Sequence, residues 1–373
     1  MKKINFIRFL KIFALALPVL LFVLLSQRYL FYFSNSNEER ILRFYQEERD
    51  SLDVVFLGAS DVFAGFAPAL AYEEYGFTSY MYTIDSNRGG LLPYQAEEVL
   101  KRQSPQYIIV EINAFLYDRP VEKEQLSVFV ENIPLSLNKI EAVWRFKEND
   151  RLLSFFPFVI HHGNWSDGEE LLEHLNWRLF AANTPSLLKG TLTRTKVDNQ
   201  LPEDIEVPAE ERAIMTVADD DLDEFLRYCQ KKNLDNVVFV RFPHKMSDMQ
   251  AECVELIKDR VQEYGYPFLN LENHKEDMGL DILQDYYNPE HLNIYGQKKL
   301  TTYLGKLLLE DYQVRPVVQS ENNRLHWEDC VHYYHSYYEY AHEHISKNSD
   351  IVCCEYFPEF FQFLDWISEQ ETA

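Results

Sequence analysis

Two segments that lie far apart in the chain carry residue types suited to acyl-transfer chemistry. The first is Leu57-Gly-Ala-Ser60-Asp61, and the second is Asn288-Pro-Glu-His291-Leu-Asn. A serine hydroxyl becomes a strong nucleophile when an imidazole accepts its proton, and such a pair is defined by geometry rather than by order in the chain. The residue types therefore suggest Ser60 as a nucleophile and His291 as its base.

Each segment also has a plain structural interpretation. Gly-x-Ser can form a simple turn in which Ser60 caps the next helix, and His291 can be a residue at a helix start or on the surface. In an open α/β sheet, however, a serine at the carboxyl end of a strand presents its hydroxyl in the ligand crevice. Backbone N–H groups beside it can then stabilise an oxyanion. The chemistry thus depends on the elements that position both segments.

Short apolar runs alternate with helix-like stretches along the chain. The runs at 53–57, 80–84, 107–112, 236–242 and 266–271 are predicted to be buried strands. Helices are predicted at 93–102, 220–232 and 248–264, and a final amphipathic helix is expected to run to about Leu309. This alternation indicates βαβ units, and hence an α/β fold with a parallel sheet covered on both faces.

The same pattern divides the chain into parts. Residues 1–34 are predicted to be a membrane anchor, 35–311 an α/β domain, and 312–373 a helical extension rich in tyrosine and histidine. The interval from about 115 to 218 is too long for a plain loop, so we expect a mainly helical insertion that caps the strand ends. A packing or partner-docking helix explains the extension better than a metal site does, and no metal is expected.

The N-terminus carries lysine and arginine residues ahead of the apolar run Ile12–Leu25. The run is short for a spanning helix, which needs about 20 apolar residues, unless Lys11 and Arg28 extend toward the lipid head groups. A cleaved signal peptide is the alternative, but no Ala-x-Ala pattern follows the run. The positive-inside rule then predicts a single-pass protein with a cytoplasmic N-terminus and an extracytoplasmic main domain.

The overall charge excludes one class of partner. The formal net charge is −24 over 373 residues. Sequence-independent binding to nucleic acid needs lysine and arginine to displace counterions from phosphates. We therefore expect no nucleic-acid partner.

Taken together, the two segments resemble the first and last conserved blocks of the SGNH/GDSL hydrolase family. The Gly-x-Ser after the first strand, and the His-Leu-Asn followed by a glycine before the last helix, carry this resemblance. More narrowly, the single anchor, the Pro-x-His-Leu-Asn sequence and the large insertion resemble the extracellular branch of cell-envelope proteins related to DltD. The resemblance covers about residues 53–112 and 236–309.

The resemblance implies a three-layer, flavodoxin-like doubly wound sheet and a role for each matching residue. Ser60 would be acylated and His291 would move its proton, while Gly89 or Gly90 and Asn113 would supply oxyanion-hole donors. The glycine pair can equally be a loop turn, and Asn113 a helix cap. No cofactor is implied. The partners implied are an envelope glycopolymer or acyl donor and a membrane-bound acyltransferase.

The sequence departs from the family at the acid of the triad. The family places an aspartate three residues before the histidine, where its charge orients the imidazole and stabilises the imidazolium, whereas this chain has Asn288. An amide lacks the charge and can favour the wrong tautomer. Asp285 or Asp281 could substitute, a backbone carbonyl could orient a Ser–His dyad, or the site could be weakly active or inactive.

These observations lead to one expected function and two alternatives. The expectation is an extracytoplasmic serine esterase or O-acyltransferase that acts on an envelope polysaccharide or teichoic acid. One alternative is a catalytically impaired SGNH-fold scaffold in cell-envelope assembly. The other is a membrane-tethered ligand-binding module without acyl chemistry.

Overall fold

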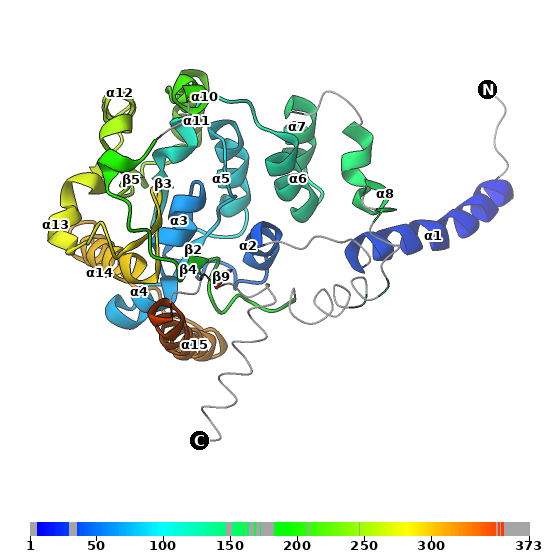
Figure 1. The fold of residues 1–373 in the computed structure, drawn as a ribbon. Helices are drawn as coiled ribbons and strands as arrows, with labels where there is room; N and C mark the ends of the chain where they lie inside the picture. The colour runs from blue at the N-terminus through cyan, green and yellow to red at the C-terminus, as the bar shows by residue number, and fades with distance from the viewer. Residues whose placement is uncertain are drawn as a thin grey trace.

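A computed structural model describes most of the chain (Figure 1). The described residues are 6–29, 36–146, 151–160, 162–163, 168, 172, 183–206, 209–245, 247–347, 350 and 352–353. Most of the expected extension beyond residue 347, and residues 30–34 of the expected anchor, therefore lie outside the described part.

Five parallel strands form the central sheet. They are β1 (Val54–Leu57), β2 (Ser79–Met81), β3 (Tyr107–Glu111), β5 (Val237–Arg241) and β6 (Phe268–Asn270), in the order β2-β1-β3-β5-β6. Each strand falls within or next to one of the apolar runs, so the predicted α/β class with a parallel sheet is confirmed. The order is one of those seen in doubly wound sheets.

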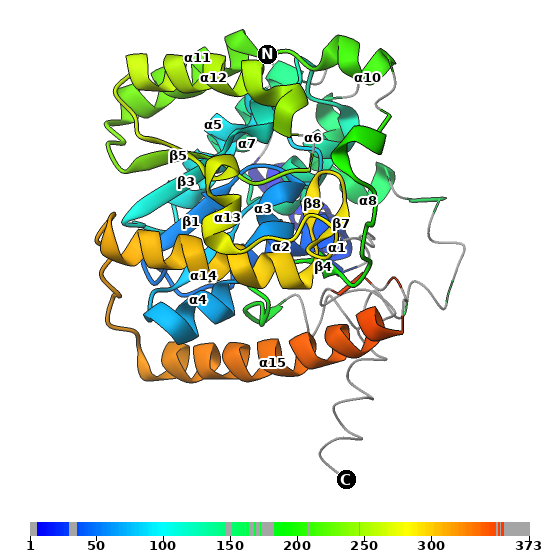
Figure 2. The ribbon, with the colours of Figure 1, turned by 60° about the vertical axis from the view of Figure 1, so that its left-hand side comes forward.

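Helices cover both faces of the sheet (Figure 2). Alternate residues of β1 show why, because Val54 and Phe56 belong to one buried apolar cluster while Val55 and Leu57 belong to another. The cluster that contains Phe56 is completed by α3 (Ser60–Gly65) and α14 (Ile294–Glu310). The other cluster is completed mainly by α5 (Leu92–Leu100), α11 (Asp219–Lys232) and α12 (Ser247–Glu263). A strand buried on both faces must be apolar throughout, as the sequence pattern indicated.

The strand order changes direction at β1. The chain leaves β1 for β2 on one side and then crosses to β3 on the other, so the two connections diverge at the carboxyl end of β1. Gly58 follows β1 with φ +149°, and a Cβ there would lie 2.8 Å from Val62 Cγ2 and 3.0 Å from Glu111 Cβ. Only glycine allows this close approach between the ends of β1 and β3, directly before Ser60.

The interval between β3 and β5 is largely helical where it is described. It contains η2 (Ile112–Phe115), α6 (Lys123–Asn132), α7 (Leu137–Phe146), η3 (Arg151–Phe155), α8 (Pro157–Ile160), η6 (Pro202–Asp204) and α10 (Ala209–Ile214). Figure 1 shows α6, α7 and α8 beside α2 (Ser36–Phe44), to one side of the sheet. A short strand, β4 (Thr193–Arg194), pairs antiparallel with β9 (Val352–Cys353).

Two long helices lie at the ends of the chain. The helix α15 (Glu321–Ser346) packs against α4 (Pro68–Tyr75) and buries Trp327, Cys330 and Tyr337. The helix α1 (Phe6–Tyr29) holds the N-terminal apolar run. Within the described ranges, none of the helices is both long enough and apolar enough to cross a membrane, so the expected transmembrane helix is not found. The 14-residue apolar run is shorter than a usual span.

Candidate active site

Ser60 is the first residue of α3, at the carboxyl end of β1. Ala59 occupies the N-cap position and its side chain makes no capping hydrogen bond, so Ser60 is not the helix cap that the structural interpretation required. The side chain of Ser60 is 9% exposed. The first N–H groups of a helix have no partner within the helix, which leaves the N–H of Ser60 free to donate to a ligand.

A hairpin brings His291 to this serine. The strands β7 (Tyr286–Asn288) and β8 (His291–Leu292) pair antiparallel just before α14. His291 Nε2 lies 2.7 Å from Ser60 Oγ, which is within hydrogen-bonding distance. The two segments singled out from the sequence therefore meet, in the geometry that proton transfer between them requires.

Asn288 takes the position next to His291 that an aspartate would occupy. Its Oδ1 accepts a hydrogen bond from the backbone N–H of Glu290 at 2.9 Å and of His291 at 2.8 Å, and it lies 2.9 Å from His291 Nδ1. The two backbone donors determine that the oxygen of the Asn288 amide, and not its NH₂ group, faces the ring. An NH₂ group in that position would face two N–H donors and could accept neither hydrogen bond. His291 therefore carries its proton on Nδ1 and presents a lone pair to Ser60. The concern that Asn288 imposes the wrong tautomer is not supported by this geometry.

Asp285, the alternative triad acid, points elsewhere. Its Oδ2 accepts hydrogen bonds from the backbone N–H of Asp281 and from Lys299 Nζ, both at 2.6 Å. Both ring nitrogens of His291 are already occupied, by Ser60 and Asn288. The structure therefore does not bring Asp285 to the imidazole.

Asn113 lies in η2, directly after β3, close to the nucleophile. Its Nδ2 donates to Asp61 Oδ2 at 2.7 Å, and its backbone N–H donates to Glu111 Oε2 at 2.7 Å. The amide nitrogen has a second hydrogen that makes no further contact among the described residues. Asn113 is thus bonded to Asp61, the residue that follows Ser60.

Gly89 and Gly90 are less well placed than Asn113 for the predicted role of oxyanion-hole donors. Gly89 and Gly90 begin the turn η1 (Gly89–Leu91), and the N–H of Gly90 donates to Asp221 Oδ2 at 2.9 Å. A Cβ at Gly89 would lie 2.5 Å from the ring of Phe115, so the glycine here serves close packing. Of the two glycines, only Gly89 keeps an N–H that no described side chain accepts.

A buried polar network beneath the serine was missed by the sequence analysis. Asp61 Oδ1 lies 2.5 Å from His244 Nε2, and His244 Nδ1 lies 2.9 Å from Arg241 Nη2. Arg241 is fully buried and also contacts Gln250 and, at 3.5 Å, Glu111. Asp61 belongs to the Ser60 segment, but no role was predicted for it. Arg241 and His244 belong to no sequence motif, although a charged arginine at the end of the apolar run 236–242 was a usable signal.

The contacts define protonation states in this network. A guanidinium only donates, so His244 Nδ1 must accept and Nε2 must carry the proton that is donated to Asp61. Burial alone raises the pKa of Asp61, but His244, His291 and Arg241 outweigh it and lower that pKa below its usual value. Asp61 is therefore an ionised carboxylate at neutral pH, adjacent in sequence to the nucleophile.

The surroundings of His291 favour its neutral form. Burial lowers the pKa of His291, while the carboxylates of Asp61, Glu290 and Asp85 act in the opposite direction. The ring of Tyr287 stacks on the imidazole with centroids 5.2 Å apart. A neutral imidazole with negative charge nearby can accept a proton and stabilise the resulting cation.

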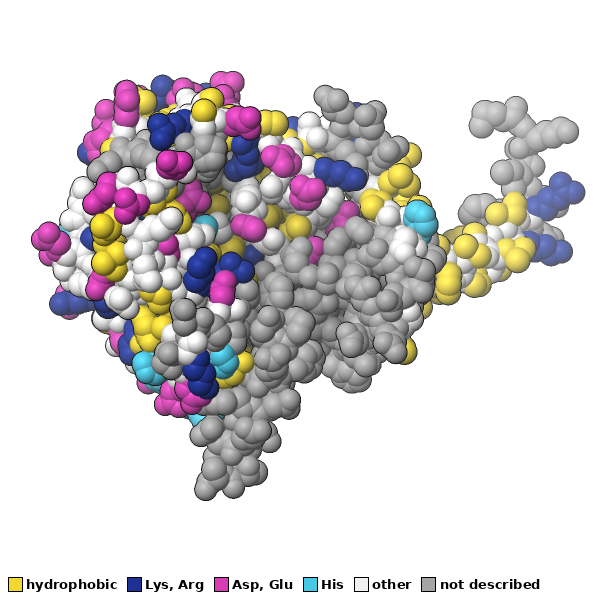
Figure 3. Space-filling view, in the orientation of Figure 1, with side chains coloured by type: hydrophobic (Ala, Val, Ile, Leu, Met, Phe, Trp, Pro, Cys, Tyr) yellow, Lys and Arg dark blue, Asp and Glu magenta, His cyan; other side chains and the backbone are white. Residues whose placement is uncertain are grey.

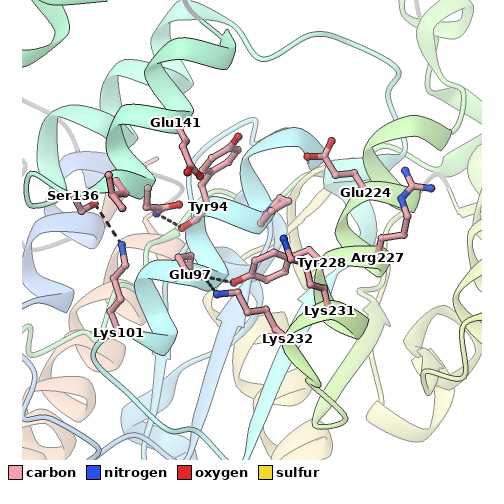
Figure 4. A pocket seen from close by; sticks show the side chains of 13 residues that line it. Tyr94, Glu97, Lys101, Ser136, Glu141, Glu224, Arg227, Tyr228, Lys231 and Lys232 are labelled. Carbon is pink, nitrogen blue, oxygen red and sulfur yellow. Dashed lines mark hydrogen bonds and ion pairs between the residues drawn. The ribbon is translucent and has the colours of Figure 1, made fainter.

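A cavity elsewhere in the molecule is shown in Figure 4. It has a volume of about 760 Å³ and is lined by residues of α5, α7 and α11, not by Ser60 or His291. Several of its polar side chains pair with each other, as Lys232 and Tyr228 do with Glu97. Chemistry rather than cavity size therefore identifies the candidate site. In the part of the chain that the structure describes, no cluster of His, Cys, Asp or Glu is arranged to hold a metal ion.

The fold and the paired side chains define a general class, an α/β protein with a serine–histidine pair at the carboxyl end of a central strand. Comparison with protein-family models gave no match, and comparison with curated proteins gave none either.

Glu111 gives this network a testable pH dependence. Burial, together with the nearby Asp61 charge, raises the pKa of Glu111 from 4.5 to about 8. Between these values the unfolded chain has released the proton and the folded chain has not, so this group makes stability fall as pH rises, by at most about 1.4 kcal/mol per pH unit. Glu111→Gln should flatten the decline in the free energy of unfolding from pH 5 to 8, measured by urea denaturation.

The exposed Glu255→Gln provides the matched control and should leave the slope unchanged. An unchanged slope in Glu111→Gln would show that Glu111 is ionised throughout this range.

Proposed function

We propose that this protein is a serine esterase or O-acyltransferase of the SGNH class. The observation that carries the proposal is the 2.7 Å separation of Ser60 Oγ and His291 Nε2, with the imidazole tautomer set by Asn288. The parallel sheet and the position of Ser60 at the carboxyl end of β1 support the class further.

In the first half of the reaction, Ser60 Oγ bonds to the ester carbonyl carbon while its proton passes to His291 Nε2. The oxyanion that forms is stabilised by the N–H of Ser60 and by the second amide hydrogen of Asn113. When the intermediate collapses, the ester C–O bond breaks and the departing alkoxide takes the proton from His291. The acyl group then remains on Ser60.

In the second half, water or a carbohydrate hydroxyl gives its proton to His291 and attacks the acyl-serine. Ser60 leaves with that proton, which regenerates the site. Water yields an esterase, and a hydroxyl acceptor yields an O-acyltransferase. Both outcomes use the same residues and need no cofactor.

Asp61 supplies the negative charge that Asn288 lacks. The Asn288 oxygen orients the imidazole through contact, but it carries no full charge to stabilise the imidazolium. Asp61 is ionised and fixed by His244 and Asn113, and among the surrounding carboxylates it raises the pKa of His291 most. In this proposal orientation and charge come from two different residues.

The substrate class and the location rest on the sequence resemblance and on the N-terminal segment. We propose an envelope polysaccharide or teichoic acid as acceptor, and a membrane-attached chain with an extracytoplasmic main domain. The apolar side chains exposed along α1, including Leu15, Val19 and Phe22, support attachment to lipid (Figure 3). A membrane-bound acyltransferase is the proposed partner.

The uncharged Asn288 favours one alternative, a scaffold that keeps this fold and has little activity. A fluorophosphonate probe separates the two proposals, because it labels only a serine that a base activates. We expect labelling of the intact protein that is lost in Ser60→Ala and falls at least about 1,000-fold in rate in His291→Ala. Ser154→Ala, which changes another buried serine, is the control. Absence of labelling between pH 6 and 9 would favour the scaffold.

Whether Asp61 supplies the negative charge that acts on His291 can be tested with two variants and their combination. Asp61→Asn should reduce kcat/KM for an activated ester by about 10–100-fold. It should also move the acidic limb of the pH profile to lower pH, because a negative charge that raises the pKa of His291 is lost. Asn288→Asp should move that limb to higher pH and increase the rate, and its gain should be larger in the Asp61→Asn background.

Glu290→Gln is the control, since Glu290 also acts on His291 but is partly exposed and therefore screened. Asparagine at position 61 can offer its oxygen to only one of the two donors, so folding of the variant is checked by circular dichroism. Equal effects of Asp61→Asn and Glu290→Gln, or no extra gain from Asn288→Asp in the double variant, would rule out this role for Asp61.

Membrane attachment predicts how the protein divides between the membrane and soluble fractions of the cell. The full chain should stay in the membrane pellet after washing with alkaline carbonate, and removal of residues 1–34 should release it. Protease added outside intact cells should digest the main domain. Release of the full chain by carbonate would contradict attachment through the N-terminal segment.

A further inference from the structure

Arg88 is a largely buried arginine whose side chain has no partner among the described residues. The residue is only 8% exposed, and its Nε is buried with no hydrogen-bond acceptor, whereas the two terminal nitrogens of the guanidinium are not fully buried. No described residue forms a hydrogen bond or ion pair with this side chain. Other buried arginines are bonded: Arg43 pairs with Glu39 at 2.6 Å, and Arg241 contacts Glu111 and Gln250.

The missing partner is unexpected on energetic grounds. A guanidinium stays protonated in proteins, and partial burial takes water away from it without a replacement acceptor among the described residues. Burial lowers the pKa of Arg88, and Glu122 and Asp85 offset this only from beyond ion-pair distance. The terminal nitrogens of Arg88 are therefore available to an anion.

The position of Arg88 links it to the candidate active site. It follows β2 and lies next to Asn87, whose Nδ2 donates to the carbonyl of Gly58 at 3.0 Å, two residues before Ser60. Tyr117 and Asp85 are near enough to Arg88 to act on its pKa. Tyr117 donates to Glu290 Oε1 at 3.1 Å, next to His291, and Asp85 also acts on the pKa of His291. Arg88 thus lies within electrostatic range of residues that adjoin the segments of the nucleophile and the base.

We infer that Arg88 binds a negatively charged group of the substrate, a phosphate or a carboxylate, close to the ester that Ser60 attacks. The planar guanidinium suits both groups, because it can donate two parallel hydrogen bonds to a pair of oxygens. That the anion belongs to the substrate of Ser60 rests on the proposed function. The anion site itself does not. It makes Arg88 a residue that selects acidic glycopolymers or acidic acyl donors over neutral ones.

Thermal denaturation of the full chain tests the anion site without requiring activity. Glycerol 1-phosphate and glucuronate serve as the phosphate and carboxylate probes, and glycerol at equal concentration as the neutral control, at constant ionic strength. We expect one of the two anions to raise the Tm of the wild-type protein and to lose this effect in Arg88→Gln. Calorimetry should show at least a ten-fold weaker affinity in the variant, with Arg88→Lys retaining part of the binding.

The Tm values of the variants, measured without added anion, give a second test. Arg88→Gln should have a Tm close to that of the wild type, because the Arg88 side chain makes no hydrogen bond or ion pair with a described residue. Arg43→Gln, which removes a buried arginine with partners, should have a lower Tm. A lower Tm in Arg88→Gln would show a structural role, and equal stabilisation of wild type and variant by the anions would also overturn the inference.

The test of the Arg88 anion site and the test of the proposed serine chemistry can succeed or fail independently. Fluorophosphonate labelling of Ser60 without anion binding at Arg88 would sustain the serine chemistry and reject this inference. Anion binding that depends on Arg88 in a protein that shows no labelling would leave a binding site in an inactive scaffold. Stabilisation by glycerol 1-phosphate alone would indicate a phosphate-bearing substrate, and stabilisation by glucuronate alone a uronic acid.

Discussion

The candidate site depends on one oxygen atom, Oδ1 of Asn288, and on the three N–H groups directed at it. Two of them are backbone groups of the β7–β8 turn, so the same atom that shapes the turn also holds the imidazole of His291. An isolated asparagine beside a histidine can present either end of its amide. Here the backbone donors allow only the oxygen, which is why an uncharged residue can still set the tautomer of a general base.

Beneath the serine, Arg241 organises a second layer of polar contacts. It is fully buried at the end of β5 and is surrounded by His244, Glu111, Gln250 and, through His244, Asp61. His244, His291 and Arg241 together lower the pKa of Asp61 against the effect of burial, whereas burial and the charge of Asp61 raise the pKa of Glu111. One carboxyl group is therefore charged and the other neutral at pH 7, within one network. Such a division is typical of sites where a single negative charge must be fixed in place.

The sequence predicted those parts of the structure that depend on local patterns. The apolar runs and their spacing predicted the strands of the parallel sheet, since a strand buried on both faces must be apolar along its length. The Ser60 and His291 segments were found because each adjoins a recognisable strand or helix. The sequence could not show that Asp221, on α11, accepts the N–H of Gly90, or that Asp285 turns toward Lys299 on α14. These contacts join segments that are distant in the chain, and no periodicity encodes them. Arg241 and His244, and the role of Asp61 in binding His244, were missed for the same reason.

The separation of orientation from charge follows from how the two effects depend on distance. A hydrogen bond fixes an imidazole only through direct contact with a well-placed acceptor, within about 3 Å. A charge acts over a longer range: at an effective dielectric constant of about 20, a unit charge interacts with another by about 4 kcal/mol at 4 Å and still by about 2 kcal/mol at 8 Å. An amide can therefore replace a carboxylate at the contact position if a fixed carboxylate remains in the next layer. Asp61 meets this condition because His244 and Asn113 hold it in place, and because His244, His291 and Arg241 lower its pKa. In the proposed mechanism, an asparagine beside the histidine is thus compatible with serine chemistry, because orientation and charge come from two different residues.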